Sequence, residues 1–352
     1  MSLDQRAVST RSAPARDRDV YDDVAAASAA IVIRRYSTSF SLACRLLDEP
    51  VRTRVRNIYA LVRLADEIVD GPFSAVDPDR TARQLDALEA ETYDAVRAGC
   101  STNLVVHAFA QTARTCRIGP DLIGPFFASM RADLDVSSHD AESLSAYVYG
   151  SAEVVGLMCL RAFLAGQPHD PGAYARLAPG AQRLGAAFQK VNFLRDLAAD
   201  HDVLGRTYVA SVDVEHLTDA ERDALLDEVD ADLAAAARAI THLPRSSRRA
   251  VSAAHGLFAE LSRRLRRTPA SEIARTRVRV PTVVKAWVVL RAIVGSRAVV
   301  PARRGDFSRI SPASATSDTS RTADASREPR TSGIPRTSGT AQALVAPDGT
   351  RS

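Results

Sequence analysis

The chain has 352 residues, enough for one large domain or two modest ones, and it is 46% hydrophobic but only 5% aromatic. Its formal charge of +4 lies in the two terminal stretches, and no basic stripe is interleaved with aromatic residues, which argues against nucleic-acid binding. The four cysteines form no CxxC pair and the seven histidines show no HxxxH or HExxH spacing, so the sequence disfavours a zinc site as well.

Scattered cysteines without a pairing pattern are typical of reduced thiols in a reducing compartment. No run approaches the roughly 20 consecutive apolar residues of a membrane span. Residues 1–19 contain no apolar segment of the secretory kind. We therefore expect a cytoplasmic protein, with peripheral membrane contact left open.

Three segments are predicted along the chain. Residues 1–19 are expected to form a disordered N-terminal arm. Residues 20–301 are predicted to form one all-α domain, because they are rich in Ala and Leu, place apolar residues at helical spacing and show no strand alternation. Residues 302–352 are rich in Ser, Thr, Arg and Pro and hold few large apolar residues, so we expect them to be disordered.

Proline and glycine divide the predicted domain into segments of helix length. The breaks fall at Asp48-Glu49-Pro50, Gly71-Pro72, Gly119-Pro120, Gln167-Pro168, Pro179-Gly180, Pro244 and Pro269.

The first unusual helix contains RLADEIVD, residues 63–70. Residues four apart share a helix face, so Asp66 and Asp70 point the same way, with Arg63 one turn earlier. The surrounding apolar residues indicate a buried helix, where two carboxylates would repel. A divalent cation would compensate for that repulsion.

A second stretch, QKVNFLRDLAAD at residues 189–200, repeats this logic. Asn192, Asp196 and Asp200 follow one another at spacings of four, and Gln189 and Arg195 lie near the stripe. Carboxylate and amide oxygens suit Mg²⁺, or Mn²⁺ as an alternative. Two such stripes facing each other would bind a diphosphate through bridging metals. One acidic pair on a helix is more commonly a solvated or ion-paired face, and that interpretation stays open for each motif alone.

The motifs together resemble the squalene/phytoene synthase family, the head-to-head prenyl-diphosphate condensing enzymes. The resemblance spans about residues 33–292 and is most like the bacterial phytoene synthases. Five stretches carry it in family order: YSTSFSLACRLL (36–47), YALVRLADEIVDG (59–71), MRADLD (130–135), YVYGSAEVVGLM (147–158) and LGAAFQKVNFLRDLAADHDVLGRTYV (184–209).

The resemblance implies an isoprenoid-synthase fold, an all-α bundle around a central cavity, and a magnesium-dependent site. Catalytic roles would fall to the four aspartates and to Tyr147. The metal ligands would be Asp66, Asp70, Asn192, Asp196 and Asp200.

The resemblance also implies a substrate site. Arg63 and Arg195 would hold diphosphate oxygens, because a guanidinium matches phosphate geometry. The hydroxyl and amide groups near the phosphates would be those of Ser37, Thr38, Ser39, Tyr59 and Gln189. The residues that line the prenyl channel would be Phe40, Tyr147, Ala152, Val155, Gly156 and Leu157. Taken without the resemblance, the small residues of 147–158 are more often helix-packing contacts, and both roles can coexist.

Some positions depart from the family pattern. Ala132 stands where phytoene synthases often have methionine, and Tyr36 stands where relatives carry His or another polar residue. A tyrosine expected before the closing stretch 275–287 is not evident. Arg279 and Lys285 of that stretch are assigned to the substrate pole.

The implied reaction joins two geranylgeranyl diphosphates through a cyclopropyl diphosphate to phytoene, in carotenoid biosynthesis, without NADPH. Squalene, dehydrosqualene or presqualene diphosphate synthesis from farnesyl diphosphate is the alternative. Other enzymes of the carotenoid pathway are candidate partners. A non-catalytic assembly factor is the alternative of another class, and the retained carboxylates disfavour it.

Overall fold

The computed structural model describes residues 13–71, 74, 77–135, 140–168, 170–204, 217–273, 275 and 278–294. Their side chains are described except at 13–16, 135, 141, 196–204 and 294. All of them belong to the compact unit Met1–Arg303. These residues form helices and no strand, so the predicted all-α fold class is confirmed.

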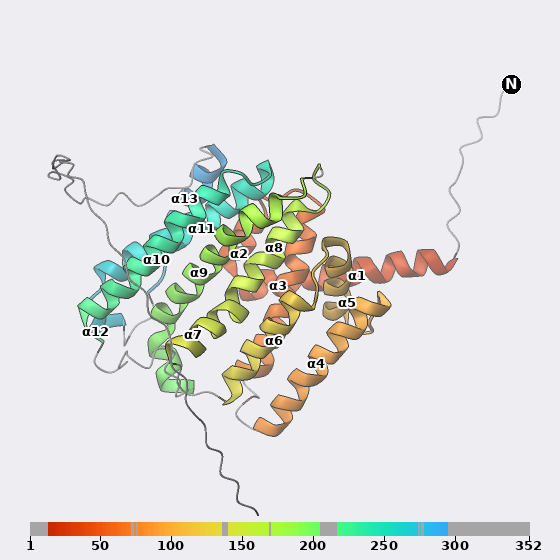
Figure 1. Cartoon of the computed structure of the whole chain (residues 1–352), viewed down its shortest axis with the longest axis horizontal. Coiled ribbons are helices and arrows are strands. Elements are labelled where there is room, and N and C mark those ends of the chain that lie inside the picture. Colours follow the sequence, from red (N-terminus) through yellow and green to blue (C-terminus); the bar gives the residue numbers. More distant parts are fainter. Residues whose placement is uncertain are drawn as a thin grey trace, which may run out of the picture. The chain divides into compact units, whose positions relative to one another are not determined.

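Figure 1 shows the helices coloured in chain order. They are α1 (Ala13–Tyr36), α2 (Thr38–Cys44), α3 (Val51–Asp70), α4 (Pro78–Ala98), α5 (Leu104–Cys116), α6 (Pro120–Asp135), α7 (Ala141–Val148), the π-helical turn η2 (Tyr149–Glu153), α8 (Val154–Leu164), α9 (Ala173–Leu204), α10 (Asp219–Ile240), α11 (Arg245–Arg267), α12 (Ala270–Ile273) and α13 (Thr282–Val294).

Local sequence signals account for several helix ends. The Asp77 side chain accepts a hydrogen bond from the Arg80 amide and caps α4, which has Pro78 in its first turn. The same helix ends at Gly99, whose φ of 79° is left-handed and suits glycine. A capping box of Thr218 and Glu221 opens α10.

The predicted break at Pro179-Gly180 is wrong, because both residues lie inside α9. An internal proline removes one helical hydrogen bond, which favours a kink or an end. Here α9 runs beside α10, and a Cβ built on Gly180 would lie 2.2 Å from the Cβ of Ala239. Packing against α10 therefore keeps the helix continuous through the proline.

The helix α1 begins at Ala13, inside the stretch 1–19 that was assigned to an arm. The start of the ordered domain is therefore earlier than predicted. Side-chain contacts fasten α1 to the start of α5. The Tyr21 hydroxyl donates to the carbonyl of Ser101 at 2.9 Å, and Asp22 Oδ1 lies 2.6 Å from Nε2 of the buried His107. The predicted tail 302–352 lies outside the described residues.

The buried apolar residues form two large clusters. One joins α3, α4, α5, α6 and α8 around Phe109, Phe126 and Phe127. The other joins α9, α10, α11 and α12 around Leu194 and Leu233. A third cluster draws on helices of both halves and connects them.

The π-helical turn η2 lies where these halves approach most closely. A Cβ on Gly150 would lie 2.1 Å from Ser129 Oγ and 2.2 Å from the carbonyl oxygen of Pro125, both in α6. A Cβ on Gly185 of α9 would lie 2.6 Å from the carbonyl oxygen of Ala152. Only glycine permits backbones to approach this closely, so both positions hold η2 between α6 and α9.

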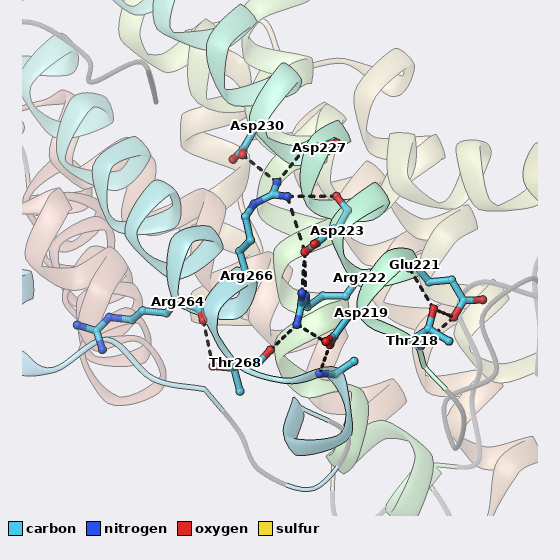
Figure 2. Close-up of polar contacts among 11 residues, drawn as sticks. Thr218, Asp219, Glu221, Arg222, Asp223, Asp227, Asp230, Arg264, Arg266 and Thr268 are labelled. Atoms are coloured by element: carbon cyan, nitrogen blue, oxygen red, sulfur yellow. Dashed lines mark hydrogen bonds and ion pairs between the residues drawn. The ribbon is translucent and has the colours of Figure 1, made fainter. Parts of the chain in front are cut away.

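A network of charged side chains connects the N-terminal part of α10 to the C-terminal end of α11 (Figure 2). Arg266 donates to Asp227 and Asp230 at 3.1 Å each. Arg222 donates to Asp219 at 2.8 Å and to the carbonyl of Thr268 at 2.7 Å. These contacts tie the end of α11 to the first four turns of α10.

The continuous helix Glu142–Leu164 is long and apolar enough to cross a membrane by length and composition alone. A core helix passes the same test, and Val154, Leu157 and Met158 of this helix belong to the first core cluster. The segment is therefore weak support for a membrane span.

We expect Gly185→Ala to destabilise the fold, because the new methyl group would collide with the backbone of η2. Overpacking of this kind costs about 1–3 kcal/mol, more than the helix propensity that alanine gains. Chemical denaturation measures the change. Gly172→Ala is the matched control, because its methyl group meets only the side chains of Arg176 and Asp170. Equal stability of the two variants would contradict the close approach.

We also expect His255 to make stability depend on pH. Burial lowers the pKa of His255, whose Nε2 lies 3.0 Å from the carbonyl oxygen of Leu233. The unfolded chain therefore binds more protons than the folded chain below about pH 6.5. As the pH is lowered through this range, the free energy of unfolding decreases by up to ~1.4 kcal/mol per pH unit. His255→Gln should flatten this fall between about pH 7 and about pH 5.5 in melting curves. The exposed His242→Gln should leave it unchanged.

Candidate active site

The first acidic motif lies on the C-terminal half of α3, where one guanidinium serves two carboxylates. Arg63 lies 3.7 Å from an oxygen of Asp66 and also forms a closer ion pair with Glu67, one turn further on. Sequence reasoning gave Glu67 no role, although its i,i+4 spacing from Arg63 was a usable signal. Internal acids therefore pair with Arg63, the predicted diphosphate-binding residue of this motif.

Tyr36, at the end of α1, covers the other side of this arginine. The guanidinium carbon of Arg63 lies 4.4 Å from the centre of the Tyr36 ring. A cation over an aromatic face is attracted by the ring quadrupole. The residue that departs from the family pattern thus contacts the predicted site directly.

Asp66 is half-buried, and 36% of its side chain is exposed. Burial raises the pKa of Asp66 to about 7, with smaller upward contributions from Asp70 and Glu67, and Arg63 opposes the shift. The first motif therefore places three carboxylates on one stretch of α3, and Arg63 forms ion pairs with two of them.

An aromatic cluster lies one turn before each acidic motif. It consists of Phe40 (α2), Tyr59 (α3), Phe188 (α9) and Phe258 (α11). The Phe40 ring centre lies 6.2 Å, 5.9 Å and 6.0 Å from the other three, and Phe188 stacks on Phe258 at 3.7 Å. Phe40 of α2 contacts both Tyr59 of α3 and Phe188 of α9. The two helices that carry the acidic motifs are therefore joined just before those motifs begin.

On α9, the second motif follows this cluster. Asn192 lies one turn after Phe188, and its Oδ1 is buried without a hydrogen-bond partner among the described residues. Gln189 and Arg195 are half-buried on the same stretch. The side chains of Asp196 and Asp200 lie outside those described, so their predicted role stays a prediction.

The predicted hydroxyl residues lie at the start of α2. Ser37 caps this helix by accepting a hydrogen bond from the Phe40 amide at 3.2 Å, and it also bonds the Tyr59 side chain. Lys285 of α13 donates to the Thr38 hydroxyl at 3.3 Å. The structure thus brings together two residues 247 positions apart that the resemblance had assigned to one pole.

Two other predicted residues make no such contact. Ser39 is half-buried beside Thr38. Arg279 is exposed, and no hydrogen bond or ion pair among the described residues joins it to the other predicted site residues. Its assignment to the substrate pole stays a prediction.

Apart from Phe40 on α2, the predicted channel residues lie on α7, η2 and α8. Tyr147 is buried, and its ring centre lies 6.1 Å from that of Phe193 on α9. Ala152 and Gly156 face backbone atoms of α9, Leu157 is in the core, and Val155 packs against it. These residues form helix-packing contacts, which was the plainer of the two interpretations from sequence.

The donor set of these motifs fits a hard cation. Among the described residues no three His, Cys, Asp or Glu side chains form a cluster that could hold a metal ion. The buried Oδ1 of Asn192 nevertheless lacks a partner, and so does the buried Nε of Arg63. An amide oxygen and carboxylates suit Mg²⁺, while a free guanidinium nitrogen suits a phosphate oxygen. The residues therefore fit a metal–diphosphate ligand.

Comparison with known proteins points the same way. The sequence model of the squalene/phytoene synthase family matches residues 33–283. The chain is 27% identical over 258 residues to the phytoene synthase of Mycobacterium tuberculosis, covering 68% of this chain and 81% of that protein. It is 31% identical over 193 residues to phytoene synthase 3 of Zea mays, and there it spans 54% of this chain and only 44% of the relative.

Solved structures share the fold. A dehydrosqualene synthase crystallised with a ligand superposes with a TM-score of 0.66 at 20% identity, covering 78% of this chain and 97% of that one. Squalene synthase HpnC from Alicyclobacillus acidocaldarius gives a TM-score of 0.61 at 22% identity, covering 70% and 95%. The predicted isoprenoid-synthase fold is thereby confirmed.

We expect Phe40→Ala to lower the free energy of unfolding by about 2 kcal/mol, because the half-buried ring contacts three aromatic residues on three other helices. Phe40→Leu keeps most of the volume and should cost less than about 1.5 kcal/mol. Denaturant titration of both variants measures the difference. An alanine variant as stable as the leucine variant would show that the cluster contributes little.

Proposed function

Because the chain belongs to the squalene/phytoene synthase family, we propose that it condenses two geranylgeranyl diphosphates head to head to phytoene. Family members act on prenyl diphosphates. The observation that carries the proposal is the aromatic cluster, which joins α3 and α9, the two helices that carry the polar motifs. The mycobacterial relative, matched over most of its own length, is a phytoene synthase, which favours the C20 substrate.

In the proposed reaction the C1–O bond of one allylic diphosphate breaks and diphosphate leaves. The C2–C3 double bond of the second substrate attacks C1, and loss of a proton gives a cyclopropylcarbinyl diphosphate. A second C–O cleavage, rearrangement and proton loss then give the hydrocarbon. No electron donor is required for this balance, so NADPH is not part of the proposal.

The charged residues would hold the leaving group. Arg63 has an unpartnered buried Nε that can donate to a phosphate oxygen, and Lys285 and Thr38 lie together at the start of α2. Mg²⁺, held by Asp66, Asp70, Asn192, Asp196 and Asp200, would supply electrostatic stabilisation of the departing diphosphate.

The apolar residues would protect the cation. Phe40, Phe188 and Phe258 form an apolar cluster next to the half-buried Tyr59. Burial raises the pKa of Tyr59, so its hydroxyl stays neutral at physiological pH. Exclusion of water prevents quenching of a carbocation before the second substrate attacks.

A second candidate is condensation of farnesyl diphosphate to a C30 product. It is favoured by the structural match, which covers 97% of a dehydrosqualene synthase. A 4,4'-diapophytoene synthase of Staphylococcus haemolyticus is also 28% identical over 202 residues. The length of the prenyl substrate depends on the depth of the channel.

The test is incubation of the purified chain and Mg²⁺ with geranylgeranyl or farnesyl diphosphate, with and without NADPH. Mass analysis of the extracted hydrocarbon identifies the product. A C40 product without NADPH supports phytoene synthesis, and a C30 product supports the second candidate. Absence of product from both substrates, in protein shown to be folded, would return the chain to the assembly-factor class.

We expect Asp66→Asn to lower turnover by at least ~10²-fold, because it removes charge that the site needs against a metal–diphosphate ligand. Asp79→Asn is the matched control, since Asp79 is an exposed carboxylate in the first turn of α4. Its turnover should equal that of the unchanged chain. If Asp66→Asn formed product at the control rate, the first motif would not contribute to the proposed mechanism in this way.

A further inference from the structure

The helix α13 packs on the bundle by one face only. Val288, Val289 and Ala292 are buried there, against Ala253 of α11 and the α2 side. A Cβ on Gly256 of α11 would lie 2.8 Å from Val288, so the helix sits close against α11. This contact fixes which face of α13 is turned away from the protein.

The outward face is apolar as well. Val283 is 81% exposed, Leu290 57% and Trp287 54%, and Ile293 lies beside them. Spacings of four and three place these residues on one stripe. In the described part of the chain, the other large exposed apolar residues all belong to α1. A surface helix that is apolar on both faces thus carries a hydrophobic stripe that no other described residue covers.

The segment of sequence that carries this stripe is basic. Residues 275–305 contain eight Lys and Arg and no Asp or Glu. Arg275, Arg279 and Arg291 are exposed, and the Arg291 guanidinium lies 4.7 Å from the centre of the Trp287 ring. The surface that covers this stripe must therefore be apolar inside and negative at its edge.

We propose that α13 is an interfacial helix that docks the protein on an anionic lipid bilayer. Val283, Trp287 and Leu290 enter the boundary between headgroups and acyl chains, and the flanking cations contact the headgroups. With 13 residues the helix is about 20 Å long, too short to span the hydrocarbon core, so it lies in the plane of the membrane. A second copy of the chain is disfavoured, because a symmetric contact would bring the two basic segments together.

The docking surface lies next to the candidate active site. Lys285 belongs to the same helix and contacts Thr38 at the start of α2. A bilayer under α13 thus meets the protein close to residues assigned to the substrate. The inference does not depend on the proposed chemistry, since lipid binding can be measured without substrate.

The chain contains one tryptophan, Trp287, so its fluorescence reports on this face alone. The full chain is mixed with vesicles of phosphatidylcholine, or of phosphatidylcholine with phosphatidylglycerol. We expect a blue shift of the emission, and quenching by brominated lipids, only with the anionic vesicles. Raising the salt concentration should reverse both, because it screens the cations.

Flotation of variants tests the residues. Trp287→Ser combined with Leu290→Ser should weaken binding at least ~10-fold, through loss of apolar burial. Arg291→Gln should weaken it by roughly fivefold on anionic vesicles alone. The matched control is Val20→Ser combined with Ile31→Ser, which removes two exposed apolar side chains from α1 and should float like the unchanged chain.

Three results would overturn the proposal. One is tryptophan emission that anionic vesicles leave unchanged. Another is emission that is blue-shifted and protected from acrylamide before lipid is added, which would mean that protein already covers the face. The third is a dimer in sedimentation that the Trp287→Ser and Leu290→Ser variant converts to a monomer, which would make α13 an interface between copies.

Discussion

The close approach of η2 to its neighbours is the constraint on which the arrangement of the bundle depends. Gly150 lets η2 rest on the backbone of α6, and Gly185 lets α9 rest on η2. A side chain at either position would come closer to neighbouring backbone than a real Cβ atom does, so a helix would have to shift. Because α9 also carries the second polar motif, the spacing set by these glycines decides how far Asn192 lies from α3.

The rotation of α9 about its own axis is set by charge. Lys190 donates to Glu228 and Asp232 of α10, at 2.9 Å and 3.0 Å, and Arg183 donates to Asp232 at 3.0 Å. Asp232 is buried and would be costly without these partners. With this face held on α10, Phe188 and Asn192 are directed away from it, toward the aromatic cluster and α2.

Much of this fold could be predicted from sequence, because proline, glycine and capping residues mark helix ends locally. The predicted helix break at Pro179 was wrong, because contacts with α10, which is distant in sequence, outweigh the local preference of proline. The π-helical turn could not be predicted either, because its shifted hydrogen bonds depend on packing between α6 and α9. In the candidate site, spacing alone indicated the shared face of Asp66 and Asp70, and the ion pair with Glu67 was present in the pattern but was not weighed.

The pairing of Arg63 with Glu67 has a consequence for turnover. Under the proposed reaction, a diphosphate that enters would compete with Glu67 for the Arg63 guanidinium, so its net gain would be smaller than that of a new ion pair. Glu67 would compete again once the bond to carbon is broken. This competition would limit how tightly the released diphosphate is retained, and the ion pair with Glu67 would hold the arginine in place after release.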